Sequence, residues 1–482
     1  MQKKYRPMIL MLVFVLSMIP LGGTDVQAQD DVTIVLSTGV QTTTALTDII
    51  ARFNDKTQTT DDDLQFQVEL QEGTWETDSQ YDGYVLKLQA EDSTFDVISM
   101  DVIWPPDFTA SGFLEPLDDV FPKSEQDKFL LAPIEAGTYE GSIYGAPWFH
   151  DSAMLYYRTD VIKAAYDNGI IDANRAPETW AELHDWSIAI VENTTFADAQ
   201  NITAGFVWQA KAYEGLICDF MEYIGGTGTY SFLNDDQSEA IFDNQNIKDA
   251  LAFMKSLIDD GASPEAVLTY TEEESRAVWH AGNAVFHRNW PYAYRLGLES
   301  VYLNGTAAGA DDKVFDVTTM PAKDSTVTNP RTSCLGGWQL GVNKFSENKP
   351  EAKAFVMWLT AEEQQLEYFL EGGQTPTRKA LYSDPAVTES DQGYVEDFFP
   401  IFDAALPRPV SPYYPAMSEK IRATINEYLG GSTTLDAAVE KMNTDVNTVI
   451  EDNQPAAGFE TEVALIFTVF ALGTLVVVRR RK

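Results

Sequence analysis

Cysteine and histidine are scarce in this chain of 482 residues, which has only two cysteines and four histidines. So few cysteines exclude a disulfide-rich scaffold, and the sequence leaves open whether Cys218 and Cys334 pair or remain separate buried thiols. Nucleophile-elbow, Cys-x-x-Cys, His-Glu-x-x-His and phosphate-loop motifs are absent, and the histidines show no metal-like spacing. We therefore predict no metal, no cofactor and no catalytic centre of these kinds.

Positive charge is also scarce. The chain has 33 Lys and Arg against 74 Asp and Glu, which gives a formal net charge of −41. A surface of this sign repels the phosphate backbone of nucleic acid, so nucleic acid is excluded as a partner. Solubility is the simplest reason for the acidity. A hydrophobic content of 44% predicts a packed globular protein, and its length favours two lobes over one core.

Long apolar runs occur only at the two ends of the chain. The first follows a basic N-terminus and ends in small residues, which predicts a signal peptide over residues 1–28. The second, Val463 to Val478, is closed by four basic residues that stay on the cytoplasmic side of a membrane. We expect the region between them at the extracellular face, followed by a linker at 451–458 and a transmembrane anchor or sorting tail at 459–482.

The segment Ala457-Gly458-Phe459-Glu460 resembles the sorting tails of archaeal surface proteins, although alanine stands where those tails have proline. This resemblance implies cleavage of the tail and its replacement by a lipid, so an anchoring helix and a processed lipid-linked tail both remain open. On an exported chain, the sequons at Asn193, Asn201 and Asn304 are candidates for glycosylation.

Strands alternate with helices in the first part of the chain. Val32 to Leu36, Leu64 to Leu70 and Phe95 to Ser99 predict strands, and Thr43 to Phe53 predicts a helix between the first two. This order is typical of an α/β sheet with mostly parallel strands and helices on both faces. Ligands of such sheets bind beyond the carboxyl ends of the strands, so the segments after Leu36 and Ile98 are expected near a site.

Helices dominate from Thr159 onward, and strand signals return between Val314 and Val342. The predicted helices are Thr159–Asp167, Thr179–Glu192, Tyr213–Ile224, Ile247–Asp259, Thr271–Ala281, Pro350–Glu371, Pro415–Leu429 and Thr434–Ile450.

Several short segments carry a recognisable pattern: Ser111–Asp119, Tyr144–Asp151, Leu155–Asp160, Glu178–Leu183, Asn289–Tyr294, Leu335–Trp338, Gln374–Arg378 and Arg408–Pro409. In this order they resemble the extracellular solute-binding proteins that include maltose-binding protein, most closely the archaeal trehalose/maltose-binding proteins. The resemblance implies an α/β fold of the two-lobed, class II periplasmic-binding-protein type, with a mixed sheet flanked by helices in each lobe and a C-terminal anchor helix.

The resemblance also divides the chain. It implies an N-terminal lobe of residues 30–150 and 338–373 and a C-terminal lobe of residues 151–337 and 374–450. The segments that cross between the lobes are expected at Phe149–Ala153, Leu335–Gln339 and Gly372–Pro376.

The function implied by the resemblance is that of the substrate-binding component of an ABC sugar importer, and not that of an enzyme. Such a protein holds a di- or oligosaccharide of trehalose or maltose type between its lobes and delivers it to permease subunits with their ATPase. Two other classes remain open: a secreted glycoside hydrolase in which Asp101 and Asp151 act as the carboxylate pair, and a surface adhesin that transports nothing.

Sugars present C–H faces that stack on aromatic rings, and the resemblance implies such rings in this chain. It assigns Trp290 and Trp338 as stacking platforms, places Tyr292 close by, and gives Gly337 a backbone contact with the ligand. A lone tryptophan is more often a core residue, so the surrounding motif carries this assignment.

Sugar hydroxyls also need charged partners, since hydrogen bonds to charged groups are about twice as strong as neutral ones. The resemblance implies that Asp101, Asp151 and Arg408 reach the sugar. The simpler interpretation is a solvated loop carboxylate for either aspartate and a surface salt bridge for the arginine. The chain departs from its relatives at Phe149, Tyr81 and Gln41–Thr43, so the identity of the sugar is left open.

Overall fold

The computed structural model describes residues 32–39, 44–59, 65–74, 76–306, 313–389, 395–403 and 405–453. The predicted signal peptide and the predicted tail at 459–482 lie outside these residues, as does Gln41–Thr43. Within the described ranges, no helix is both long enough and apolar enough to span a bilayer.

A seven-stranded sheet forms the core of the first lobe. Its central strands have the order β13-β12-β3-β1-β2, and β4 and β7 also pair with β12. Their bounds are β1 Val32–Thr38, β2 Phe66–Glu72, β3 Val97–Asp101, β4 Leu114–Glu115, β7 Ala146–Ser152, β12 Ser333–Asn343 and β13 Ala405–Leu406. β1 runs parallel to β2 and β3, whereas β12 runs antiparallel to β3, β4 and β7. The sheet is mixed, as predicted.

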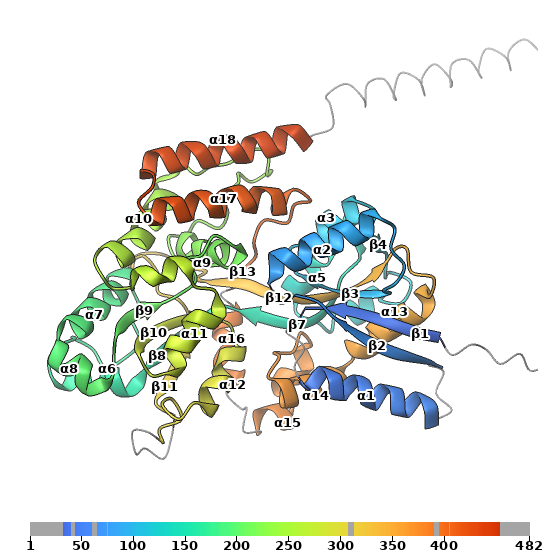
Figure 1. Ribbon diagram of the computed structural model, residues 1–482, viewed down its shortest axis with the longest axis horizontal. Coiled ribbons are helices and arrows are strands. Elements are labelled where there is room, and N and C mark those ends of the chain that lie inside the picture. The colour runs from blue at the N-terminus through green and yellow to red at the C-terminus, as the bar shows by residue number, and fades with distance from the viewer. Residues whose placement is uncertain are drawn as a thin grey trace, which may run out of the picture.

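Helices cover both faces of this sheet (Figure 1). Ile34 and Leu36 of β1 are fully buried. Phe53 of α1 packs against Phe66 of β2 and Phe355 of α13. The elements of this part are α1 Thr44–Thr59, α2 Thr77–Gln89, α3 Pro105–Ala110, α4 Lys123–Gln126, α5 Leu131–Ala136, β5 Thr138–Tyr139, β6 Ser142–Ile143, α13 Lys349–Leu359 and α14 Glu362–Gly372.

A four-stranded sheet of order β11-β8-β10-β9 forms the core of the second lobe. Its strands are β8 Met154–Arg158, β9 Ala204–Val207, β10 Ala284–Asn289 and β11 Phe315–Thr318. The helices after β8 are α6 Thr159–Asp167, α7 Trp180–Glu192, α8 Thr194–Gln200, α9 Glu214–Gly225, α10 Gln245–Asp259, η1 Glu265–Thr269, α11 Glu272–His280 and α12 Tyr292–Glu299. Those near the C-terminal end are η2 Lys379–Ser383, α15 Pro385–Thr388, α16 Val395–Asp403, α17 Tyr414–Leu429 and α18 Leu435–Asn453.

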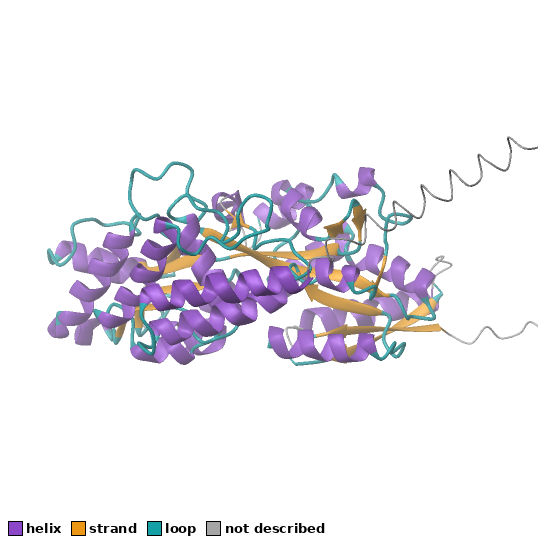
Figure 2. Ribbon diagram, turned by 90° about the horizontal axis from the view of Figure 1, so that it is seen from above, coloured by secondary structure: helices purple, strands orange, loops and turns teal. Residues whose placement is uncertain are grey.

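Continuous strands connect the two sheets. Ala153 alone separates β7, which belongs to the first sheet, from β8, which belongs to the second. β12 runs beside β7, with Leu335 opposite Ser152 and Trp338 opposite Phe149. The lobes therefore lie side by side with this strand pair between them (Figures 1 and 2). The predicted two-lobed α/β fold is confirmed, while the residue ranges given to each lobe stay a prediction.

One predicted helix is divided in two. The sequence predicts a single helix over Pro350–Glu371, but α13 ends at Leu359 and α14 begins at Glu362. Ala361 adopts an extended conformation at the break, with φ −70° and ψ 164°. The carbonyl of Thr360, beside it, accepts a hydrogen bond of 2.7 Å from Nε of Arg378, so a tertiary contact satisfies this carbonyl at the break.

The last helix is longer than predicted. α18 continues three residues beyond Ile450 to Asn453, so the first part of the predicted linker at 451–458 is helical. The hydroxyl of Tyr413 donates to the carbonyl of Asn453 at 2.9 Å, which gives one of the unpaired carbonyls at this helix end a partner.

Candidate ligand-binding site

A cavity of about 670 Å³ lies between the two lobes, and all of the residues predicted to form the site line it: Asp101, Asp151, Trp290, Tyr292, Gly337, Trp338 and Arg408. These residues come from β3, β7, the turn after β10, the start of α12, β12 and the segment after β13. The volume falls within the range of about 300–1,000 Å³ that is usual for pockets holding small organic ligands.

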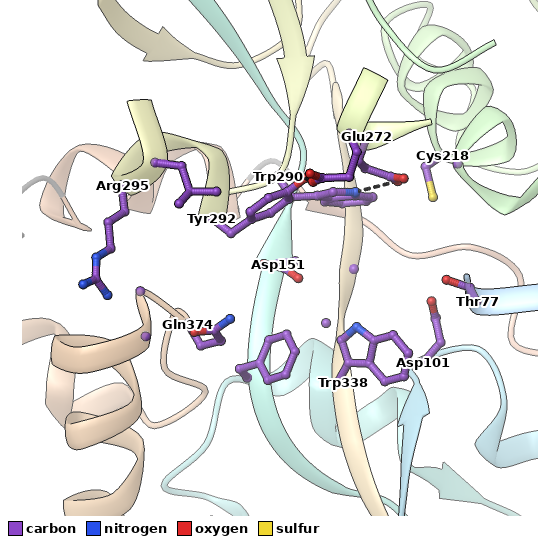
Figure 3. A pocket seen from close by; sticks show the side chains of 18 of the residues that line it. Thr77, Asp101, Asp151, Cys218, Glu272, Trp290, Tyr292, Arg295, Trp338 and Gln374 are labelled. Carbon is purple, nitrogen blue, oxygen red and sulfur yellow. Dashed lines mark hydrogen bonds between the residues drawn. The ribbon is translucent and has the colours of Figure 1, made fainter. Parts of the chain in front are cut away.

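Trp290 follows the last residue of β10 and precedes α12 (Figure 3). Pro291 caps α12 and leaves the indole outside the helix, as predicted. The ring is oriented by two contacts: its Nε1–H donates to Glu272 Oε1 at 3.2 Å, and its backbone N–H donates to Asn289 Oδ1 at 2.8 Å. The indole is therefore held as a fixed part of the cavity wall.

A buried cation lies behind Trp290. The guanidinium of Arg288 is fully buried and lies over the indole. It donates to both carboxylate oxygens of Glu222 and, at 3.0 Å, to Oε1 of Gln209. Arg288 does not line the cavity, so it contacts the indole from the protein side and leaves the other face toward the cavity.

Trp338 lies in the middle of β12, where it is opposite both Asp101 and Phe149. Its ring meets Trp104 edge-on at a centroid distance of 5.6 Å and is only 7% exposed. Trp338 is therefore a core residue with one part in the cavity, and its predicted stacking on a sugar remains a proposal.

The two glycines before Trp338 permit a close approach of strands and rings. A Cβ on Gly336 would lie 2.9 Å from Cζ3 of Trp290. A Cβ on Gly337 would lie 2.6 Å from the carbonyl oxygen of Phe149, and the φ of Gly337 is +116°, a value that favours glycine. Only glycine at 336 and 337 lets β12, β7 and the indole meet in this way.

Arg408 is buried, with 4% exposure, so the interpretation as a surface salt bridge is wrong. Its guanidinium donates to Asp101 Oδ1 at 2.8 Å and to Glu214 Oε1 at 2.8 Å. Asp101 ends β3 in the first lobe and Glu214 begins α9 in the second, so Arg408 joins the lobes. Burial raises the pKa of Asp101, and the nearby Arg408 charge opposes this shift.

Asp151 differs from Asp101 because it has no such cation. Within the described part of the chain, no hydrogen bond or ion pair joins its carboxyl to another side chain, and it lines the cavity with partial exposure. Burial, followed by the negative charge of Asp101, raises the pKa of Asp151 to about 8. At neutral pH this carboxyl is mainly protonated and can donate a hydrogen bond as well as accept one.

Tyr292 and two acidic residues form the wall beside Trp290. The Tyr292 hydroxyl donates to Glu273 Oε1 at 2.8 Å. Glu272 and Glu273 occupy the first turn of α11, where Thr271 and Glu274 form a capping box that fixes the start of the helix. The cap thus determines where both carboxylates enter the cavity.

Sequence reasoning missed much of the cavity wall. The further lining residues are Thr44, Ala45, Glu76, Thr77, Phe149, Tyr213, Glu214, Gly215, Cys218, Glu272, Glu273, Arg295, Leu296, Glu299, Gly336, Glu371, Gly372, Gly373 and Gln374. For Phe149, Gly336 and Gly372 to Gln374 the three predicted crossings were a usable signal, whereas acidic residues are too common in this chain for residue type to single any out.

The two cysteines and Tyr81 also have defined surroundings. Cys218 and Cys334 are both buried free thiols, and the neighbouring Cys334 thiol together with burial raises the pKa of Cys218. Tyr81 donates its hydroxyl to Asp107 and does not line the cavity. Among the described residues, no group of His, Cys, Asp or Glu side chains is arranged to hold a metal ion.

A profile of the family described as bacterial extracellular solute-binding protein matches residues 39–366. The chain belongs to this family. A relative in Deinococcus radiodurans, a "Probable ABC transporter-binding protein", is 33% identical over 336 residues, covering 70% of this chain and 74% of the relative. Members of the family bind solutes for ABC transporters, so this protein is not an enzyme and the glycoside hydrolase alternative is excluded.

Solved structures support the same relationship. Maltose-bound MalE3 of T. maritima is 32% identical with a TM-score of 0.73, and the match covers 87% of this chain and 100% of that one. A tagatose-bound solute-binding protein of Thermotoga lettingae has the same TM-score, 0.73, at 24% identity, with coverage of 87% and 100%, which shows likeness of fold alone. The expected closeness to archaeal members stays a prediction.

Proposed function

We propose that this solute-binding protein captures a di- or oligosaccharide of trehalose or maltose type in the cavity between its lobes and delivers it to an ABC permease. The observation that carries the proposal is the arrangement of two indoles and one carboxyl. Trp290 comes from one lobe, Trp338 from the strand that crosses between the lobes, and Asp151 lies between them (Figure 3).

This arrangement suits an uncharged, hydroxyl-rich ligand. Aromatic rings accept the C–H faces of a sugar, and a protonated Asp151 can give one hydrogen bond to a hydroxyl and accept another. Among the described residues, the cavity wall has two arginines, Arg295 and Arg408, against several carboxylates, so it does not favour an anionic solute. Arg408 is moreover occupied by Asp101 and Glu214. The 32% identical relative of known structure holds maltose, which agrees with this chemistry.

Calorimetry with the purified protein tests the proposal. We expect maltose or trehalose to bind and to raise the melting temperature, because a ligand that binds only the folded state stabilises it. Mannitol and tagatose serve as comparison ligands of smaller size. If no member of a broad sugar panel binds or changes the melting temperature, the sugar assignment is wrong.

We also propose that residues 459–482 hold the protein at the extracellular face, either as a retained helix or through a lipid that replaces the tail. Fractionation of cells that express the full chain or a chain ending at residue 458 tests this. Recovery of both forms in the medium in equal amounts would refute the anchor.

A further inference from the structure

Two ion pairs join the lobes beside α2. Lys211, in the segment between β9 and α9, lies 3.2 Å from Glu76, which precedes α2. Arg422 of α17 lies 2.7 Å from Asp78 of α2. Glu76 also lines the cavity. We call this pair of contacts the α2 clasp, since α2 belongs to the first lobe and the two cations belong to the second.

A third contact joins the lobes beside α14. Arg295 of α12, in the second lobe, donates a hydrogen bond to the carbonyl of Glu371 near the end of α14, in the first lobe. The Glu371 carboxylate itself lies 3.1 Å from Arg52 of α1, so this acceptor is fixed within the first lobe. Arg295 and Glu371 both line the cavity. We call this contact the α14 clasp.

The two clasps lie at opposite ends of the cavity. In Figure 3, Thr77 of α2 and Arg295 of α12 stand at the two sides of the pocket, with Trp290, Asp151 and Trp338 between them. The paired strands β7 and β12 form the connection between the lobes at the back. A linear guest that lies on the tryptophans therefore points toward a clasp with each of its ends.

We propose that the two clasps set an upper limit on the length of the bound saccharide, so that the protein selects short oligosaccharides. The inference rests on the proposed sugar-binding function. A cavity of about 670 Å³ accommodates a guest of drug-like size, about two or three sugar rings. A longer saccharide would have to separate Lys211 from Glu76 or break the hydrogen bond from Arg295 to the Glu371 carbonyl.

A ladder of α-1,4-linked glucose oligomers, from glucose to maltoheptaose, tests the limit by calorimetry on the full-length protein. We expect binding to be tightest at two or three rings and at least about tenfold weaker at seven. Lys211→Ala removes the ion pair of the α2 clasp that lies at the cavity, and Arg295→Ala opens the α14 clasp. We expect at least one of them to reduce the ratio of short-chain to long-chain affinity about fivefold or more.

Lys255→Ala is the matched control. Lys255 lies on α10 and forms an ion pair of 2.9 Å with Asp259 of the same helix, outside the cavity. Its removal takes away a partly exposed lysine and should leave the length preference unchanged. The preference is read as a ratio within each variant, so an effect of Arg295→Ala on all sugars alike does not alter it.

The outcomes separate the inference from the function on which it rests. Equal binding of maltose and maltoheptaose by the unaltered protein overturns the length limit and leaves the sugar-binding function intact. The length limit is also overturned if each clasp variant changes the affinity for saccharides of every length by the same factor, because the clasps then act only on lobe closure. If no oligomer binds to the unaltered protein, the proposed α-glucan ligand itself is wrong.

Discussion

The guanidinium carbon of Arg288 lies 4.3 Å from the centroid of the Trp290 ring, so a fully buried cation supports an indole that faces the cavity. Glu222 neutralises that cation within the second lobe, and Glu272 holds the edge of the same ring. Trp290 is therefore positioned before any ligand arrives, which is the condition under which a stacking platform contributes most to affinity.

Replacement of Trp290 by alanine should weaken sugar binding. The loss of stacking and of buried aromatic area predicts a cost of about 1–3 kcal/mol, to be measured by calorimetry. Trp358→Ala is the matched control, because Trp358 stacks with Phe355 on α13 and does not line the cavity. An equal loss of affinity in both variants would remove Trp290 from the site.

Gly336→Ala should displace the indole without unfolding the protein. The new methyl would lie 2.9 Å from Trp290 Cζ3, so the ring has to move. We expect affinity to fall about tenfold, which corresponds to about 1.4 kcal/mol. Gly83→Ala on α2 is the control, since no atom lies within 4 Å of a Cβ there. Retention of full affinity by Gly336→Ala would contradict the tight fit between β12 and the ring.

Stability should depend on pH through Asp151. Its pKa is about 8 in the folded protein against an ordinary value of 3.8, so the folded state binds a proton that the unfolded state releases. The contribution of the protonated carboxyl is therefore complete at low pH and is lost as pH rises through about 8.

Asp151→Asn removes this titration. We expect the unfolding free energy of the variant, relative to the unaltered protein, to increase between pH 5 and pH 8.5 by at least about 1.4 kcal/mol, the equivalent of one pKa unit. Urea denaturation at the two pH values measures the difference. A constant difference across this range would show that the carboxyl titrates normally.

Removal of Arg408 should destabilise the protein more than removal of its whole ion-pair group. Arg408→Met leaves Asp101 buried without a cation and leaves Glu214 with Arg422 alone, at 3.8 Å, which predicts a loss of about 3–5 kcal/mol in urea denaturation. Adding Asp101→Asn and Glu214→Gln should recover most of that loss, because no charge then remains unpaired. A triple variant as unstable as Arg408→Met would show that packing of the arginine stem matters more than its charge.

The sequence predicts most of the elements because local patterns encode them, whereas the candidate site residues follow from the family resemblance. Thr271 with Glu274 is a capping signal that fixes the start of α11, and Pro291 marks the start of α12. The position of Trp290 between strand and helix follows from those signals. The family resemblance then brings Trp290 and Trp338 together, which no single segment could indicate.

The features that the sequence did not predict depend on contacts between distant segments. The carbonyl of Thr360, just after α13, is bound by Arg378, and Arg295 reaches Glu371 only once the lobes are packed. The burial of Arg408 between two carboxylates is also invisible in the sequence, where Arg408 precedes a proline in an apparently ordinary loop. Residue type alone suggested a surface ion pair there.

Ala153 is the single residue between β7 and β8, and its backbone N–H donates to the carbonyl of Cys334 on β12 at 3.2 Å. Because two covalently continuous strands pass side by side at this point, we expect any relative movement of the lobes to be a tilt about it rather than a sliding motion. Asp151 and Gly337 lie within a few residues of that point, so a ligand held by them is close to the axis about which the lobes would tilt. A small change in angle beside the guest becomes a large displacement at the outer rims of the lobes.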